Sequence, residues 1–372
     1  MMKSMDWKSE NNFPDEFHGV ACEVYRGDPN WIPESPGMLK LAFGPHNRYF
    51  DKNSAWIGCE PDMARLAGFY NPDLLINDQH VAFFGYWETI DAYHANRKLF
   101  SEFESWARDK GAVTVYGPIN FTTFGSYRIR LDRFEDGCYP GEPYNPPYYP
   151  RFLEDLGFKI AYRYMTLGGD LHQAYQRSCE ISKDDMKRAD ENGIVFVPLT
   201  HDFLLKSLES LYELVDAVFS GNFAYTKISS EEFKAGFGAT LARNICPESS
   251  VLALDSEGNI AGFFINLPDY GLLCRQGAPN RIAPGQLEYG KHFQFLMKPT
   301  LLLKTVGIQP KWRNQGLFTV MVYFCMKWAL PHYSRCAGAT MREDNYSLNI
   351  ARRVFEGCDD IKRHYGLFAK SL

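Results

Sequence analysis

The spacing of apolar positions divides the chain into alternating strands and helices. Short apolar or alternating runs between turn residues indicate strands, and apolar residues three or four positions apart indicate helices. In the first half this pattern predicts a helix over 13–25, a hairpin over 55–70, an aromatic strand over 81–88, a helix over 92–110, a strand over 113–116, a short helix over 148–156 and a strand over 159–167.

The second half repeats that order of elements. The pattern predicts a strand over 194–198, a helix over 203–219 with Asp202 as its N-cap, a helix beginning at Ser229 with Glu232 at capping-box spacing, a hairpin over 251–267, a strand over 302–309, an apolar helix from 317, a strand over 336–341, a helix over 345–356 and a last strand over 362–370. Because the repetition lies in element order and not in residue identity, it predicts a degenerate structural duplication. We expect domains over 1–175 and 190–372, with a polar linker between Gly168 and Gly193.

Length and composition agree with two soluble domains. A chain of 372 residues exceeds one typical core, and 45% hydrophobic residues can fill two cores. Forty Lys and Arg against 45 Asp and Glu give a net charge of −5, which argues against a general nucleic-acid binder.

Cysteine usage and hydropathy indicate a cytoplasmic protein that binds neither a metal nor a membrane. The nine cysteines include no Cys-x-x-Cys pair, which favours reduced, buried thiols over a disulfide framework or a zinc site. The first residues lack the apolar stretch of a signal peptide, and no apolar run approaches the roughly 18 residues of a membrane span.

The segment Val306–Phe318 carries the most informative chemistry. It reads as the end of a strand, stopped by Pro310, followed by an Arg-x-x-Gly turn from Arg313 to Gly316 and then a buried helix. The first N–H groups of a helix lack partners and carry about half a positive charge, so this entrance favours an anion. The segment therefore predicts a site for the pyrophosphate of a coenzyme; the alternative is an ordinary strand–turn–helix without a ligand.

Four of these residues match motif A of the GNAT acetyltransferase superfamily, which the segment resembles: Ile308, Pro310, Arg313 and Gly316. Phe318 departs from the family pattern, in which Gly or Ala is usual. Its benzyl group would either crowd the diphosphate or point into the core.

Further segments along nearly the whole chain are similar to bacterial two-domain GNAT-like proteins: Tyr25–Pro33, Phe83–Gly85, Gly117–Asn120, Tyr144–Tyr149, Gly157–Phe158 and Glu343–Asn345. The resemblance implies an α/β mixed-sheet fold with tandem GNAT-like domains, that is, the acyl-CoA N-acyltransferase fold, with the N-terminal domain degenerate. At the corresponding helix entrance the first half carries Glu88-Thr-Ile-Asp91, whose two carboxylates would repel a diphosphate. We therefore assign the coenzyme to the second half.

The activity implied by the resemblance is N-acyltransfer. An acyl group, in first place acetyl, would pass directly from a CoA thioester to a small-molecule amine. Two alternatives stay open: an acyl carrier protein as the donor, or a non-catalytic protein that binds a ligand in the same place. The resemblance places pantetheine beside Val306, Gly307 and Ile308, and the diphosphate at Arg313, Asn314, Gln315, Gly316, Leu317 and Phe318. Asn345 is a candidate contact for the pantetheine arm or a helix N-cap.

Candidate catalytic residues are less specific. Glu343 follows the strand over 336–341, a common place for active-site carboxylates, but also reads as part of a surface acidic pair. Glu288 lies four positions before His292 in an inserted segment and is a second candidate base. The last helix has no Tyr where the family takes its thiolate-protonating acid, so Tyr346 and Tyr365 are the nearby substitutes.

An aromatic cluster precedes the linker. Tyrosines interleaved with prolines give a rigid amphipathic surface, which would either wall a cleft between the halves or pack a loop. The cluster comprises Tyr139, Tyr144, Tyr148 and Tyr149.

Overall fold

Two compact units make up the chain. The computed structural model describes residues 2–234 and 238–372. Unit 1 consists of Met1–Arg163, Cys274–Arg281 and His364–Leu372, and unit 2 of Tyr164–Leu273 and Ile282–Arg363. Each unit has its own strands, helices and hydrophobic core, which agrees with the expected mixed α/β architecture. The boundaries 1–175 and 190–372 stay a prediction about independent domains.

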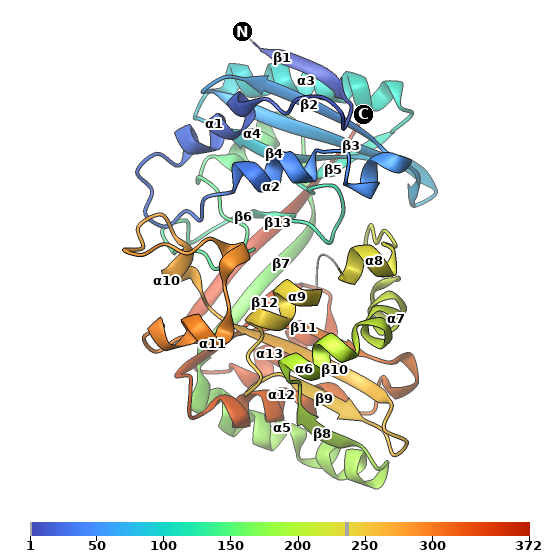
Figure 1. The fold of residues 1–372 in the computed structure, drawn as a ribbon, viewed down its shortest axis with the longest axis vertical. Helices are drawn as coiled ribbons and strands as arrows, with labels where there is room; N and C mark the ends of the chain where they lie inside the picture. The colour runs from blue at the N-terminus through green and yellow to red at the C-terminus, as the bar shows by residue number, and fades with distance from the viewer. Residues whose placement is uncertain (1, 235–237) are drawn as a thin grey trace. The chain divides into compact units, whose positions relative to one another are not determined.

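The strands of unit 1 follow the order β1-β2-β3-β4-β5-β13, with β6 beside β13 (Figure 1). The pairs along this order are antiparallel except for β4 and β5, which are parallel. Their bounds are β1 (Lys3–Trp7), β2 (Ser54–Glu60), β3 (Ala64–Ile76), β4 (Gln79–Thr89), β5 (Thr114–Gly117), β6 (Ile129–Arg130) and β13 (Ile361–Ser371).

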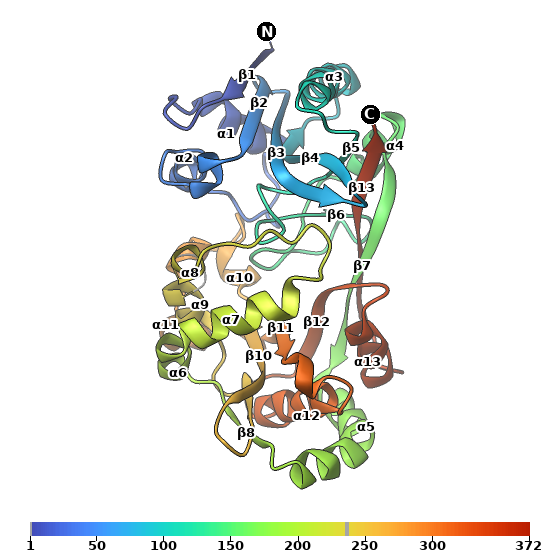
Figure 2. The same cartoon turned by 90° about the vertical axis from the view of Figure 1, so that its right-hand side faces the viewer.

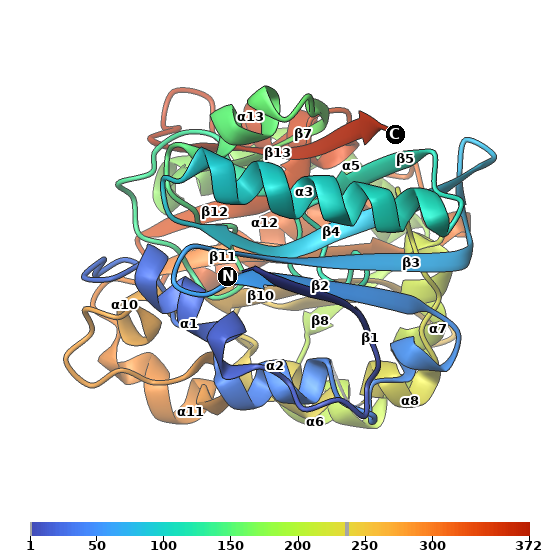
Figure 3. The same ribbon diagram turned by 90° about the horizontal axis from the view of Figure 1, so that it is seen from above.

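Helices cover both faces of these strands. The helices of unit 1 are α1 (Asp15–Val24), α2 (Pro36–Ala42), α3 (Tyr93–Asp109) and α4 (Tyr149–Asp155), with a 3₁₀ turn at Arg48–Asp51. Helix α3 lies on one face and α1 and α2 on the other (Figures 2 and 3). Strand alternation sorts the side chains: Leu66 packs in the core cluster with Phe103 of α3, whereas Arg65 reaches the carbonyl of Phe17 in α1.

The strands of unit 2 follow the order β7-β12-β11-β10-β9-β8. Along this order β11 and β12 pair in parallel, and the other pairs are antiparallel. Their bounds are β7 (Lys159–Asp170), β8 (Val195–Pro198), β9 (Val251–Leu254), β10 (Ile260–Pro268), β11 (Thr300–Ile308) and β12 (Arg335–Arg342).

The long helices α5 (Leu171–Glu191) and α12 (Leu317–Ala329) pack against each other on one face of these strands (Figure 1). The other face carries α6 (His201–Lys206) and α7 (Leu208–Phe219) (Figure 2). The remaining helices are α8 (Ser230–Phe233), α9 (Ala239–Asn244), α10 (Gly271–Cys274), α11 (Tyr289–His292) and α13 (Tyr346–Val354), with 3₁₀ turns at Pro284–Gln286, Phe293–Phe295 and Pro310–Trp312.

Three local expectations need correction. The supposed linker between Gly168 and Gly193 is mostly helix α5, whose buried face consists largely of small residues such as Ala174 and Ser178 and therefore gives a weak apolar signal. The helix expected over 203–219 is two helices that meet at Ser207. The N-cap of the first is Thr200 and not Asp202, since the Thr200 side chain accepts from the N–H of Phe203. The capping box at Ser229 is confirmed.

The contact between α3 and the sheet can be tested with two glycines. A Cβ on Gly68 would lie 2.7 Å from the Phe103 ring, so Gly68→Ala should lower the free energy of unfolding by about 1–3 kcal/mol. Gly19 lies inside α1 with nothing within 4 Å of its would-be Cβ, so Gly19→Ala should raise that free energy by about 0.5–1 kcal/mol. Urea unfolding of both variants measures the difference. Equal effects of the two substitutions would contradict the tight packing at Gly68.

Candidate functional site

Strands β11 and β12 separate part-way along their length. Their parallel pairing runs as far as Leu303 and Gly338 and, within the described part of the chain, ends there. Strand β11 continues beside β10 to Ile308, but β12 bends away at a bulge. Thr340 in this bulge has a left-handed backbone (φ 49°), and its N–H donates to Oγ1 of Thr166 on β7 at 3.2 Å. The bulge thus leaves one edge of β11 without a strand partner.

A cavity of about 730 Å³ opens along this edge. Its size falls within the range of small-molecule sites in proteins. Residues from β11, β12, α5, α7 and α13 line it together with the turn before α12 and the first turn of that helix. The cavity therefore combines an unpaired strand edge with a helix entrance.

Helix α12 begins at this cavity as the sequence predicts. Gly316 is its N-cap and has φ +80°, a conformation that suits glycine. No acceptor among the described residues binds the N–H groups of Leu317, Phe318 and Thr319. Three unpaired amides and the positive end of the helix dipole thus face the cavity region, which is the geometry of an anion site.

Asp185 of α5 lies next to this helix entrance. A Cβ on Gly316 would come within 2.2 Å of the Asp185 carboxyl carbon. The carboxylate accepts a hydrogen bond from Oγ1 of Thr319 and forms an ion pair with Arg188 at 3.2 Å. A negative charge here stabilises the helix but opposes an incoming diphosphate. Asp185 is not predicted from the sequence, because residues 183–188 read there as part of a polar linker.

The structure brings most of the predicted coenzyme residues together. Eight of them line the cavity: Val306, Ile308, Arg313, Asn314, Gly316, Leu317, Phe318 and Asn345. Gly307 does not line it; a Cβ at this residue would lie 2.5 Å from the Phe263 ring. Gln315 does not line it either, and its Nε2 donates to the carbonyl of Lys311 at 3.0 Å. Asn345 is the N-cap of α13, and its side chain accepts from the N–H of Ser347 at 3.3 Å.

Phe318 packs along the cavity wall. Its ring stacks on Phe264 of β10 at a centroid distance of 5.9 Å and meets Tyr346 edge-on at 6.2 Å. The cavity reaches beyond the ring to Ser347 and Ile350 of α13. Phe318 therefore narrows the cavity beside Tyr346 and does not close it.

Of the three candidate catalytic residues, only Tyr346 lines the cavity, where it begins α13 and is 61% exposed. Glu343 is exposed in the turn before α13 and lies outside the lining. Glu288 precedes α11, forms an ion pair with Lys291 at 2.8 Å and is also outside the lining. The nearby substitute Tyr365 is buried in unit 1 with its hydroxyl bonded to Glu142, so it is unavailable to this cavity.

No protein-family model matches the sequence, and no curated protein matches it either. Solved structures do match. A tandem GNAT protein from the clavulanic acid biosynthesis pathway, solved without acetyl-CoA, aligns over 100% of this chain and 98% of its own with a TM-score of 0.52 and 11% identity. This chain has the fold of the GCN5-related N-acetyltransferases.

Two further GNAT-fold structures agree. One is a probable N-acyltransferase from Enterococcus faecalis V583 (TM-score 0.51, 9% identity, 100% of this chain and 73% of that chain). The other contains the glucosamine N-acetyltransferase region of a fungal multi-domain GH3 β-N-acetylglucosaminidase (TM-score 0.54, 11% identity, 100% of this chain), of which this chain spans only 38%. Likeness at these identities shows the fold, and the predicted tandem GNAT-like architecture is confirmed. None of the described helices combines the length and the apolarity that a membrane crossing needs.

In unit 1, the space between the corresponding pair of parallel strands is filled by the chain itself. Its parallel pair β4 and β5 separates after Phe83 and Tyr116. Beyond that point the N–H of Ile119 donates to the carbonyl of Phe84 at 2.7 Å, and Oδ1 of Asn120 accepts from the N–H of Tyr86 at 2.8 Å. The space that stays open beyond the last paired residues of β11 and β12 in unit 2 is thus filled by the chain itself in unit 1.

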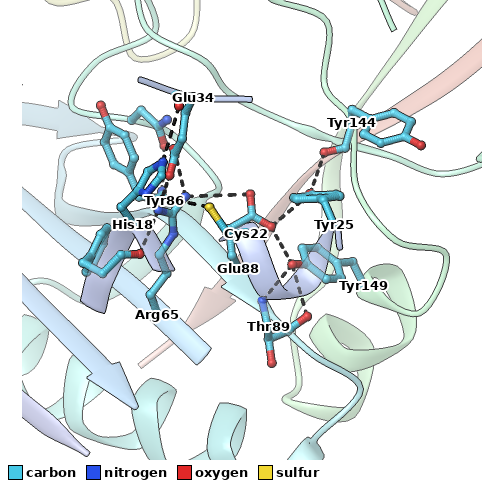
Figure 4. Close-up of polar contacts among 12 residues, drawn as sticks. His18, Cys22, Tyr25, Glu34, Arg65, Tyr86, Glu88, Thr89, Tyr144 and Tyr149 are labelled. Atoms are coloured by element: carbon cyan, nitrogen blue, oxygen red, sulfur yellow. Dashed lines mark hydrogen bonds and ion pairs between the residues drawn. The ribbon is translucent and has the colours of Figure 1, made fainter. Parts of the chain in front are cut away.

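Unit 1 instead has a polar pocket of about 250 Å³ next to the end of β4 (Figure 4). Tyr139, Tyr144 and Tyr149 of the predicted aromatic cluster line it, whereas the hydroxyl of Tyr148 donates to the carbonyl of Thr89 at 2.8 Å.

Glu88 lines this pocket, and its carboxylate accepts hydrogen bonds from the hydroxyls of Tyr25 at 3.0 Å and Tyr149 at 2.7 Å. Burial raises the pKa of Glu88 to about 7, although Arg65 and the two tyrosines lower it. Glu34 raises it further.

The raised pKa of Glu88 makes stability depend on pH. The folded state holds the proton more tightly than the unfolded state, whose pKa is near 4.5. The stability contribution is therefore complete below about pH 4.5 and falls as pH rises through about 7, by at most about 3 kcal/mol. Because glutamine cannot ionise, the Tm of Glu88→Gln minus that of the wild type should increase between pH 5 and pH 8. Thermal melts across this range, with Glu60→Gln as the matched control, measure it; a constant difference would contradict the raised pKa.

Proposed function

We propose that unit 2 binds an acyl thioester of coenzyme A and transfers the acyl group, in first place acetyl, to a small-molecule amine. One observation supports this most: the unpaired edge of β11 and the unpaired amides of α12 border the same cavity. A strand edge can bind the amide groups of a pantetheine arm, and helix amides can bind its phosphates.

The proposed reaction is a direct transfer. The amine nitrogen attacks the thioester carbonyl carbon, the C–S bond breaks, and the thiolate takes up a proton while the ammonium loses one. Tyr346 is our proposed acid, since its hydroxyl-bearing ring lines the cavity. For the base, Glu343 and Glu288 stay predictions. Asp185, the one carboxylate among the described cavity-lining residues, is already bound to Thr319 and Arg188.

A second donor class has support from two residues. Asp185 adds negative charge where a diphosphate would bind, and Phe318 narrows the cavity. Both features disfavour free CoA relative to an acyl carrier protein, which presents pantetheine with a single phosphate. Asp185 is therefore expected to influence the choice between these donors.

Binding of acetyl-CoA tests the site. At about 100 times its dissociation constant, acetyl-CoA should stabilise the wild type by about 2.7 kcal/mol in a thermal shift. Arg313→Ala should weaken this binding about tenfold or more, because Arg313 lines the cavity from the turn before α12 and adds a positive charge there. Asp185→Asn should strengthen it about two- to fivefold by removing a like charge.

Acetyl-pantetheine, which lacks the diphosphate, is the matched ligand and should respond to neither substitution. Gly316 is a poor probe, since a side chain there would strain the backbone and meet Asp185. If acetyl-CoA does not bind while an acyl carrier protein does, the donor is the carrier; if neither thioester binds, the proposal is wrong.

The role of Tyr346 can be tested separately. Tyr346→Phe keeps the ring against Phe318 and removes the proposed acid. Release of free CoA from acetyl-CoA in the presence of an amine mixture should slow by about 10²-fold or more, with little change in KM. Tyr323→Phe on α12 is the control. An unchanged kcat would exclude Tyr346 as the acid, and release by neither wild type nor variant would favour the non-catalytic alternative.

A further inference from the structure

The pocket of unit 1 contains an incompletely satisfied carboxylate. Both accepted hydrogen bonds of Glu88, from Tyr25 and Tyr149, end on Oε2. No donor among the described residues lies within hydrogen-bond distance of Oε1, whose nearest cation is Arg65 Nη2 at 4.0 Å. The Glu88 side chain is 18% exposed, and it lines the pocket. An acceptor in a pocket of this kind binds a donor from water or from a ligand that replaces the water.

Arg65 cannot supply that donor in its present arrangement. Its Nη1 and Nη2 both donate to the Glu34 carboxylate, and Nη1 also donates to the carbonyl of Phe17 at 3.0 Å (Figure 4). Arg65 is 1% exposed, and these bonds hold its guanidinium. One cation therefore serves two carboxylates, and the pairing with Glu34 leaves Glu88 short of positive charge.

Two other charged residues line the pocket, Glu142 and Arg128. Glu142 forms an ion pair with Arg130 at 3.0 Å, and both of these side chains are fully buried. The guanidinium of Arg128 lies 3.6 Å from the centroid of the Tyr127 ring, on the wall of the pocket. Eight of the 22 lining residues are aromatic, among them Tyr25, which stacks on Trp31 at 4.8 Å. Aromatic faces favour an organic cation.

We propose that this pocket binds a small organic ammonium ion, with Oε1 of Glu88 as its counter-ion and the aromatic wall around its alkyl part. The cation supplies both the missing donor and the missing charge. Two kinds of compound present this group: a simple amine, and an amino acid whose carboxylate would face Arg128. The proposal concerns binding in unit 1 and holds whether or not unit 2 transfers an acyl group.

Three probes of equal length test the proposal on the full chain without any acyl donor: n-pentylamine, norvaline and pentanoate. Isothermal titration should show binding of pentylamine, norvaline or both, and pentanoate should bind at least tenfold more weakly. Glu88→Gln should lower the affinity for the ammonium probes at least tenfold, because the amide lacks the negative charge. Glu60→Gln, on β2 and outside the pocket lining, should leave their affinity unchanged.

A second variant covers the case in which Glu88→Gln fails to fold. Ser126 is an exposed residue that lines the pocket, so Ser126→Phe adds bulk there without disturbing the core. This substitution should also lower the affinity for the ammonium probes. Preference for norvaline over pentylamine identifies an amino acid, and equal binding identifies a simple amine; both support the site. No binding of either ammonium probe, equal binding of pentanoate, or affinity unaffected by the folded variants overturns it.

Discussion

The divergence of β11 and β12 is the constraint on which the candidate site depends. Two parallel strands normally satisfy each other's backbone groups along their full length. Here β12 has a bulge at Thr340, whose N–H donates a hydrogen bond to the Thr166 side chain of β7. Beyond this bulge the edge of β11 has no neighbouring strand. Backbone groups at such an edge need water or a ligand, and a cavity of about 730 Å³ offers room for either. The chemistry proposed for unit 2 follows from this irregularity in the pairing of β12.

Unit 1 shows what happens when the same gap is filled from within. The Asn120 side chain and the Ile119 amide bind the backbone of β4 at Tyr86 and Phe84, so no edge is left for a thioester. At the end of the same strand, Glu88 is held by two tyrosine hydroxyls. The duplication has therefore kept the strand arrangement, while the polar groups at the strand ends have diverged.

Local sequence was sufficient for most elements and for the helix entrance. Gly316, Pro310 and the apolar run from Leu317 each have a strong local preference, and the structure shows the turn and helix that they predict. Helix α5 was missed because its buried positions include Ser178 and Ser182, which read as polar surface in sequence. The exposure of Glu343 and the internal pairing of Glu288 could not be predicted, since both depend on tertiary packing.

Asp185 could not be predicted for the same reason, because its position next to Gly316 depends on the packing of α5 against α12. Its charge also shows how the two cavities differ in polarity. The cavity of unit 2 presents hydrogen-bond donors without acceptors, namely the first amides of α12. The nearby Asp185 carboxylate does not bind these amides; its partners are Thr319 and Arg188.

The pocket of unit 1 presents the reverse, since Oε1 of Glu88 is an acceptor without a donor and its one nearby cation is committed to Glu34. A polar group without a protein partner gains a hydrogen bond when a ligand of the opposite polarity binds beside it, so each cavity favours such a ligand. An anionic ligand therefore suits unit 2 and a cationic one unit 1. Because these two preferences arise from different residues, neither assignment depends on the other.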